Sequence, residues 1–301
     1  MTAPSDPIYV FGEAMIELSN LAGDSARIGV AGDSFNAAVY LSRSGIQTRY
    51  VSAFGDDSFS QRIVDVLKGE SIDTRDCIII ANMAPGLYAI DLDNMGERSF
   101  TYWRSDSAAR RFFDRPQSRA IIDSMKAAKA LYLSGITLSI FNAAERAVIT
   151  DIARAVKASG GQVAFDTNYR AKGWEDAQTA RAAINAIMPF VTIALPTWED
   201  ERDLFGDAGP HVTAARWSAA GVDEVVVKAG ARGAYNKDVD WIAPAQKIRP
   251  LDTTGAGDSF NGAYLAARLS GGNIEAAMRA GHDLAAKVLM ASGAILPADN
   301  L

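Results

Sequence analysis

The sequence is poor in cysteine and histidine, which excludes two common kinds of site. Cys77 is the only cysteine among 301 residues, so an intrachain disulfide is impossible and a reducing compartment is expected. His211 and His282 are the only histidines, and they lie far apart without cysteine or acidic partners at ligand spacing. A zinc site is therefore not expected.

Long apolar runs and an excess of basic residues are also missing. No run reaches the roughly 18 apolar residues that a membrane-spanning helix needs, and the residues before Ile8 do not resemble a signal peptide. The formal net charge is −6, which gives no general electrostatic reason to bind nucleic acid or an anionic membrane. These absences predict a cytoplasmic protein, in which a small anion would need a local basic pocket.

Two common phosphate-binding motifs are absent as well. No Gly-Lys pair occurs anywhere, which excludes a Walker A loop, and no Gly-x-Gly-x-x-Gly follows a predicted strand. Any anion site in this chain must therefore be of another type.

What is present is the pattern of a folded α/β protein, with 49% hydrophobic and 22% charged residues. Segments with the spacing of strands and of helices alternate along the chain. The predicted strands are 8–18, 50–54, 131–134, 163–166 and 224–229, and the predicted helices are 34–44, 143–158 and 177–188. Asp33 or Ser34 is the expected N-cap of the first helix, and Gly45 its stop. The alternation predicts a doubly wound, mostly parallel sheet flanked by helices, with ligands at the carboxyl ends of its strands.

One region departs from this alternation. Residues 87–92 and 99–103 are rich in strand formers, and Asp93-Asn94-Met95-Gly96 between them has the composition of a hairpin turn. We expect segments 14–30 and 86–105 to form a small β-sheet lid within a single domain of residues 1–301. Exposed lid strands also predict a homo-oligomer, a dimer or higher, that assembles through the lid.

A glycine-rich turn near the C-terminus, Asp-Thr-Thr-Gly-Ala-Gly-Asp from Asp252 to Asp258, precedes a helix of small and apolar residues. The first N–H groups of a helix lack partners and the helix dipole adds partial positive charge, so an anion can bind there. Asp258 is then placed to accept a proton from a hydroxyl that attacks phosphorus. In the alternative, Asp258 only caps the helix and the glycines only form a turn.

This turn and the pattern Gly32-Asp33 with Asn36 resemble the two signatures of the ribokinase-like (PfkB) carbohydrate kinases. The resemblance implies a ribokinase-like fold and transfer of the γ-phosphoryl group of ATP to a sugar hydroxyl. It implies that the backbone of Gly255, Ala256 and Gly257 stabilises the phosphoryl group while Asp258 is the base. Mg²⁺ is expected to bridge the ATP phosphates.

Four further segments resemble the 2-keto-3-deoxygluconate kinases: 12–18, 85–88, 96–104 and 166–170. This resemblance implies phosphorylation of O6 of 2-keto-3-deoxy-D-gluconate. The residues implied to surround the sugar acid are Gly32, Asn36, Tyr88, Tyr102, Arg104, Asn168, Arg170 and Asp258. The two arginines make physical sense, because an acidic protein needs guanidinium groups to hold an anionic substrate. The alternative is surface salt bridges for the arginines and strand packing for the tyrosines.

The nucleotide side is also implied by resemblance, since Lys228 to Ala234 resembles the family's glycine-containing segment that approaches ATP. The implied nucleotide contacts are Lys228, Gly230, Gly233, Thr253, Gly255, Gly257 and His282. Family position makes Glu199, Asp200 and Glu201 the candidates to organise magnesium. Two positions depart from the family pattern: Pro196-Thr197-Trp198-Glu199 replaces Asn-x-x-Glu, and Ala31 replaces the first glycine of Gly-Gly-Asp.

Two alternative functions stay open at this point. The first is a kinase of the same family that acts on a neutral sugar such as fructose or ribose. The second is a sugar-acid sensor that kept the fold and lost turnover, although Asp258 and its glycine turn argue against this.

Overall fold

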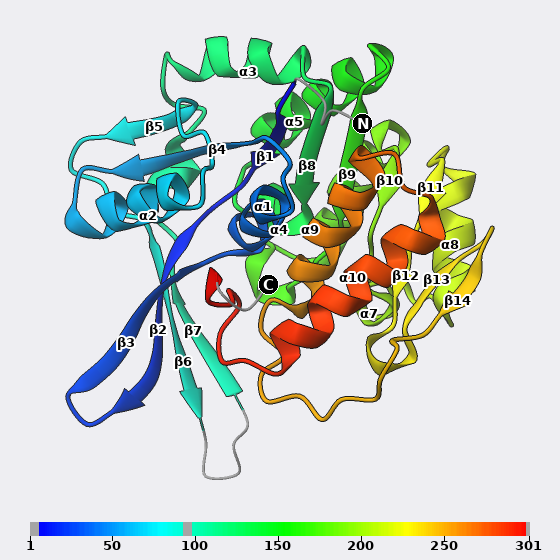
Figure 1. The fold of residues 1–301 in the computed structure, drawn as a ribbon. Coiled ribbons are helices and arrows are strands. Elements are labelled where there is room, and N and C mark those ends of the chain that lie inside the picture. Colours follow the sequence, from blue (N-terminus) through cyan, green and yellow to red (C-terminus); the bar gives the residue numbers. More distant parts are fainter. Residues whose placement is uncertain (1–5, 93–97, 299–301) are drawn as a thin grey trace.

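The computed structural model describes residues 6–92 and 98–298, and its centre is a seven-stranded sheet (Figure 1). The strand order is β11-β10-β9-β8-β1-β4-β5, and every neighbouring pair is parallel. The strands are β1 (Ile8–Phe11), β4 (Thr48–Gly55), β5 (Cys77–Ile80), β8 (Ala130–Ser134), β9 (Gln162–Asp166), β10 (Ile193–Ala194) and β11 (Glu224–Val225). The predicted doubly wound sheet is confirmed. Because the order reverses between β1 and β8, a ligand site is expected at their carboxyl ends.

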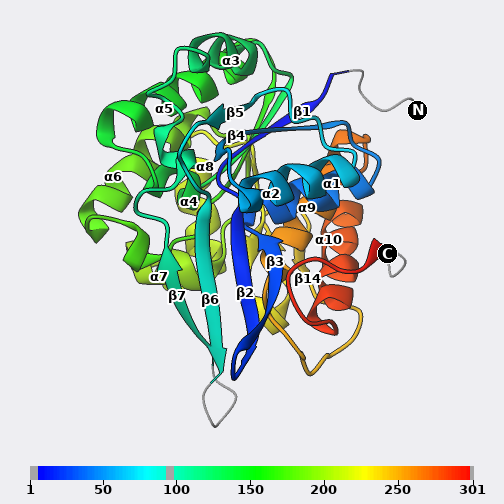
Figure 2. The ribbon, with the colours of Figure 1, turned by 90° about the vertical axis from the view of Figure 1, so that its left-hand side faces the viewer.

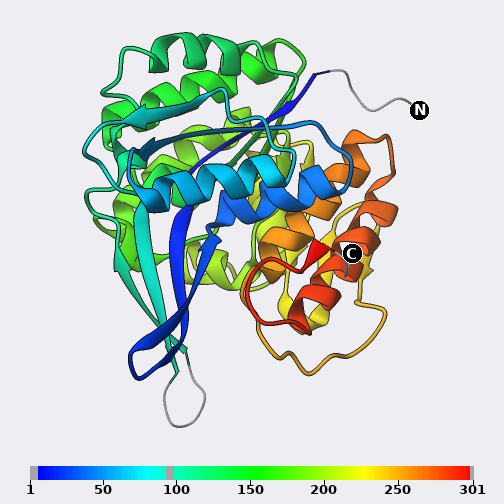
Figure 3. The same ribbon diagram turned by 60° about the vertical axis from the view of Figure 1, so that its left-hand side comes forward.

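Helices cover both faces of this sheet, as Figure 3 shows. They are α1 (Asp33–Arg43), α2 (Ser58–Gly69), α3 (Ser118–Lys126), α4 (Gly135–Ser139), α5 (Ala143–Ala158), α6 (Ala177–Ile187), α7 (Trp198–Phe205), α8 (Pro210–Ala219), α9 (Ala256–Leu269) and α10 (Ile274–Leu289). Alternate side chains of β1 point to opposite faces. Ile8 and Val10 join the core with α1 and α9, whereas Tyr9 and Phe11 join the core with α5 and α6. No helix in the described ranges is long and apolar enough to span a bilayer.

A second sheet of four strands extends away from the body (Figure 2). Its order is β3-β2-β6-β7, and its strands are β2 (Met15–Ala22), β3 (Ser25–Ala31), β6 (Gly86–Leu92) and β7 (Arg98–Trp103). The two segments expected to form the lid supply all four strands. The expected turn Asp93-Asn94-Met95-Gly96 lies outside the described residues.

Two predicted strands are each divided between sheets. Residues 8–18 are not one strand, because the chain leaves the large sheet after Gly12, whose N–H donates to Val51, and enters the small sheet at Met15. Residues 224–229 are likewise divided into β11 and β12 (Val227–Lys228). Strand β12 pairs with β13 (Ala234–Asn236), which pairs with β14 (Asp240–Ile242), in a separate antiparallel sheet. In both cases the apolar run continues while its hydrogen-bonding partner changes.

Candidate active site

Helix α9 begins at Gly255, which has the left-handed φ of 74°. A Cβ at Gly255 would lie 2.7 Å from the Cβ of Ala294, so both the backbone conformation and the available space require glycine. Ala256 and Gly257 are the first two residues of the helix, where backbone N–H groups lack partners within the helix itself. Asp258 lies in this first turn.

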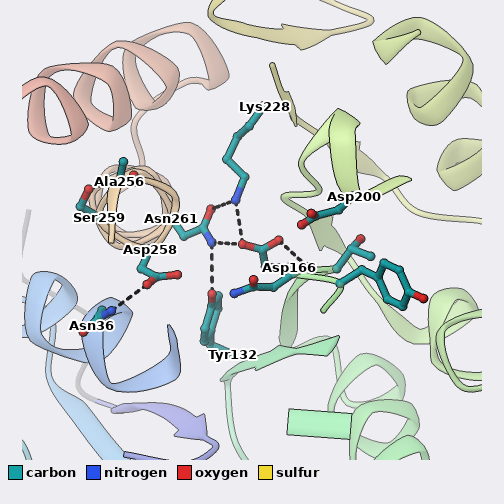
Figure 4. A network of polar contacts seen from close by, with 12 residues as sticks. Asn36, Tyr132, Asp166, Asp200, Lys228, Ala256, Asp258, Ser259 and Asn261 are labelled. Carbon is teal, nitrogen blue, oxygen red and sulfur yellow. Dashed lines mark hydrogen bonds and ion pairs between the residues drawn. The ribbon is translucent and has the colours of Figure 1, made fainter. Parts of the chain in front are cut away.

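The start of α1 faces the start of α9. Asn36 donates from Nδ2 to Oδ2 of Asp258 across 2.8 Å (Figure 4), which joins residues that are 222 positions apart. The N-cap of α1 is Gly32 rather than Asp33 or Ser34, because the chain arrives with a φ of 152° that a side chain does not favour. Ala31 has no positive φ, so its extra methyl group causes no strain there.

The carboxyl group of Asp258 is strongly perturbed. Desolvation, with the nearby charge of Asp33 as the second cause, raises the pKa of Asp258 to about 7, against the opposing hydrogen bond from Asn36. Burial also raises the pKa of Asp33. A carboxylate whose pKa is close to neutral is an effective proton acceptor, because it is ionised yet holds a proton well.

The small sheet contributes buried carboxylates and aromatic side chains to the site. Arg104 forms an ion pair with Glu13, whose side chain is only 1% exposed. Tyr88 donates to Oε2 of Glu17 across 2.5 Å, and its ring lies 5.7 Å from that of Tyr102. Burial is the main cause that raises the pKa of Tyr88. Of the predicted sugar-acid residues, Tyr88 and Tyr102 face each other on the pair β6–β7, and Arg104, which directly follows β7, already has a carboxylate partner.

The other two predicted sugar-acid residues follow β9. Asn168 has a φ of 35°, which is uncommon for a residue with a side chain. Arg170 donates from Nη1 to both carboxylate oxygens of Asp200, at 3.1 and 3.3 Å, and its side chain is 57% exposed. Desolvation raises the pKa of Asp200 to about 6, although Arg170 opposes this. Asp200, itself a candidate magnesium ligand, thus pairs with Arg170, which is predicted to bind the sugar acid.

The acidic residues at the start of α7 have different surroundings. Glu201 is fully buried, where it accepts hydrogen bonds from Thr167, Arg216 and Trp217. This network holds α7 against β9 and α8. Glu199 stays partly exposed. The described residues contain no group of three or more His, Cys, Asp or Glu side chains suited to a metal ion, and a metal role for Glu199 and Asp200 stays a prediction.

The residues predicted for the nucleotide belong to the segment that starts at Lys228, to the start of α9 and to α10. Gly230 and Gly233 have positive φ values of 54° and 103°. His282 shares a hydrogen bond of 2.9 Å with the carbonyl of Ile242, and burial lowers its pKa. The carbonyl of Thr253 accepts a bond from the N–H of Ala256 within the turn. These contacts fix the shape of the turn and its surroundings; contact of the residues with a nucleotide stays a prediction.

Lys228 lies in a buried polar network (Figure 4). Its Nζ donates to Oδ2 of Asp166 at 2.7 Å and to Oδ1 of Asn261 at 2.9 Å. Asn261 donates from Nδ2 to the same oxygen of Asp166 at 2.6 Å and to the hydroxyl of Tyr132 at 3.1 Å. Sequence reasoning named Lys228 but missed its partners. The signals were an aspartate at the end of a predicted strand and an asparagine three residues after Asp258, on the same face of a helix.

Several buried polar atoms in this region have no hydrogen-bond partner among the described residues. They are Glu13 Oε1, Asp33 Oδ2, Asn36 Oδ1, Arg104 Nε and Asn168 Oδ1. Each such atom costs about 1–3 kcal/mol when it stays unpaired. A ligand rich in hydroxyl groups supplies both donors and acceptors, so the arrangement suits a sugar or a sugar acid.

An α/β fold with a glycine-rich helix start and a buried aspartate beside it is the arrangement expected of a small-molecule kinase. A profile of the pfkB family carbohydrate kinases matches residues 6–301. The chain therefore belongs to the pfkB family of carbohydrate kinases. The expected family resemblance is confirmed over nearly the whole chain.

Curated relatives narrow the comparison. The 2-dehydro-3-deoxygluconokinase of Escherichia coli strain K12 is 40% identical, with 99% of each chain covered. The enzyme of the same name from Dickeya dadantii is 39% identical, with 98% of each chain covered. A crystal structure of a putative ribokinase II from E. coli has a TM-score of 0.83 at 22% identity, covering 96% of this chain and 94% of that chain. This last similarity concerns the fold, which is ribokinase-like.

Proposed function

We propose that this protein transfers the γ-phosphoryl group of ATP to O6 of 2-keto-3-deoxy-D-gluconate, also called 2-dehydro-3-deoxy-D-gluconate. It is then a 2-dehydro-3-deoxygluconokinase, like its full-length relatives. The observation that carries the proposal is Asp258 with its pKa near 7 in the first turn of α9, held by Asn36. A base with this pKa beside an anion-binding helix start suits transfer of a phosphoryl group to a hydroxyl.

The proposed step needs little from the protein beyond positioning and charge. Asp258 accepts the proton of the O6 hydroxyl as that oxygen bonds to the γ-phosphorus. The bond from phosphorus to the bridging oxygen of ADP breaks, and ADP leaves with the electron pair. Backbone N–H groups of Gly255 to Asp258 stabilise the transferring phosphoryl group.

We assign the substrate carboxylate to Arg104 and Arg170. Both guanidinium groups have carboxylate partners in this structure, Glu13 and Asp200. A bound sugar acid therefore shares or replaces these partners, and the more exposed Arg170 is the easier one to recruit. The same pairing favours a second candidate, because a pocket with balanced charges also accommodates a neutral sugar such as fructose or ribose.

We further propose that a divalent metal ion, Mg²⁺, accompanies ATP. Carboxylate oxygens are ligands that Mg²⁺ prefers, together with water and phosphate oxygens. Glu199 fits this role better than Asp200, which pairs with Arg170, or Glu201, which is part of the core. A magnesium ion held there with ATP would neutralise charge on the phosphate oxygens.

Oligomerisation through the small sheet and a cytoplasmic location stay proposals. The small sheet carries exposed large apolar side chains, which often mark contact surfaces. They are Leu21, Ile28, Phe100, Tyr102 and Trp103, with Trp103 58% exposed. Sedimentation velocity at micromolar concentration is expected to give the mass of a dimer or a larger assembly, and a monomer would contradict the proposal.

The proposed function is tested by coupled ADP release with magnesium and ATP. The acceptors are 2-keto-3-deoxygluconate, its galactonate-derived epimer, fructose, ribose and no sugar. We expect turnover with the keto-deoxy acids, a product phosphorylated at C6 by ³¹P NMR, and a loss of about 100- to 10,000-fold in Asp258→Asn. Preference for fructose or ribose would show that the protein is a neutral-sugar kinase, the second candidate. Wild-type turnover in Asp258→Asn would contradict the assignment of Asp258 as the base.

A further inference from the structure

The network around Lys228 contains charges that are expensive to bury. Asp166, Lys228 and Asn261 are 2%, 7% and 0% exposed. A buried ion pair often adds little net stability, since desolvation offsets the attraction between the charges. The arrangement therefore calls for a reason other than holding strands together.

The position of the ammonium group suggests that reason. A lysine has three N–H donors, and Asp166 and Asn261 account for two of them. A Cβ built on Gly257 would lie 3.6 Å from Nζ of Lys228, so the ammonium group lies against the first turn of α9. This turn carries Asp258 and lies at the positive end of the helix dipole. The ammonium group thus adds a full positive charge to the partial charge of the helix start.

Asp166 and Asn261 restrict where this charge can lie. Oδ2 of Asp166 accepts from both Lys228 and Asn261, and its Oδ1 accepts from the N–H of Asn168 at 3.1 Å. Asn261 follows Asp258 by three residues, so the two side chains leave α9 on the side that faces Asp166 (Figure 4). The same carboxylate thereby fixes Lys228 at the phosphoryl end of the site and the backbone of Asn168 at the sugar end.

We infer that Lys228 is a catalytic residue that stabilises the charge of the transferring phosphoryl group, and that Asp166 and Asn261 are positioning residues that hold its ammonium group there. The inference rests on the proposed phosphoryl transfer and adds no bond change to it. Lys228 exchanges no proton in this step: the phosphorus–oxygen bond to ADP breaks and the acceptor proton moves to Asp258. A fixed charge acts most strongly where negative charge develops.

The test compares Lys228→Met and Lys228→Arg with the wild-type enzyme, using the acceptor that the wild type turns over. We expect Lys228→Met to lower kcat about 100-fold with little change in KM for the acceptor, and Lys228→Arg to regain part of the loss. Asp166→Asn and Asn261→Leu are expected to lower kcat about tenfold, because the ammonium group is then held less firmly.

A second measurement separates catalysis from folding. Lys228→Met leaves the Asp166 carboxylate unpaired, so Lys228→Met/Asp166→Asn removes both charges and is expected to fold. Lys157→Met is the matched control, because Lys157 also makes several hydrogen bonds through Nζ but lies away from the proposed site. Its acceptors are the carbonyls of Pro189, Val191 and Gly221. We expect Lys157→Met to change thermal stability and leave kcat unchanged.

Failure of the proposed substrate and failure of the role of Lys228 give different results. A wild-type protein that phosphorylates only neutral sugars refutes the substrate assignment, and the lysine variants are then tested with that sugar. A folded double variant with wild-type kcat overturns the inference and makes the network purely structural. A loss of kcat in Lys157→Met equal to that in Lys228→Met would also overturn it.

Discussion

The raised pKa of Asp258 has a direct consequence for the pH dependence of turnover. The proposed base accepts a proton only when it is ionised, so kcat/KM for the acceptor is expected to follow the ionised fraction of Asp258. With a pKa of about 7, this fraction is about one-eleventh at pH 6 and ten-elevenths at pH 8. We therefore expect kcat/KM to fall about tenfold from pH 8 to pH 6.

The assay is ADP release at saturating ATP and magnesium, with the acceptor well below its KM, in buffers of constant ionic strength. ATP also ionises in this pH range, so a second protein is needed to assign the change to Asp258. In Asp33→Asn, the nearby negative charge that helps raise the pKa of Asp258 is absent. Ionisation of Asp258 is then easier, and the acidic limb is expected to move to lower pH.

Two results would refute this reasoning. A flat profile from pH 6 to pH 8 means that Asp258 titrates like an exposed aspartate, near its usual pKa of about 3.9. Identical acidic limbs in the wild type and Asp33→Asn mean that the observed titration belongs to ATP or to another group.

Further predictions concern the sugar pocket and the turn. Arg104→Leu is expected to weaken sugar-acid binding. It is also expected to lower stability by about 3–5 kcal/mol, because Glu13 is left buried and unpaired. Thermal unfolding of Arg104→Leu, compared with that of Arg104→Leu/Glu13→Leu, measures this loss of stability. Arg170→Leu is expected to weaken sugar-acid binding more than ATP binding by calorimetry, with little loss of stability since its side chain is 57% exposed. Gly255→Ala is expected to lower the urea midpoint more than Gly45→Ala, because both glycines have positive φ but only Gly255 also faces a close neighbour; equal shifts would contradict this.

The parts of the site that follow from local chemistry could be predicted from the sequence. The turn from Asp252 to Asp258 specifies its own helix start, because the glycines and the small residues after them leave few other conformations. The alternation of strands and helices likewise predicted the parallel sheet. Two strand boundaries were wrong, because an apolar run shows that residues are buried but not which sheet buries them.

The parts that depend on distant partners could not be predicted. Lys228 meets Asp166 and Asn261 from 62 and 33 positions away, and Asp166 meets Asn261 from 95. The spacing within Glu199-Asp200-Glu201 likewise gives no sign that one carboxylate is in the core and another binds an arginine. Only the packing of α7 and β9 decides this.

The four-stranded sheet and the body of the molecule carry different parts of the proposed site. Strands β2, β3, β6 and β7 carry Tyr88 and Tyr102, with Glu13 and Arg104 at their ends, whereas Asp258 and Lys228 belong to the body. The chain passes between the two parts at a few short crossings, such as Gly12 to Met15 and Ala31 to Asp33. Substitutions in the small sheet can therefore change one wall of the proposed acceptor pocket without changing the residues around Asp258 and Lys228.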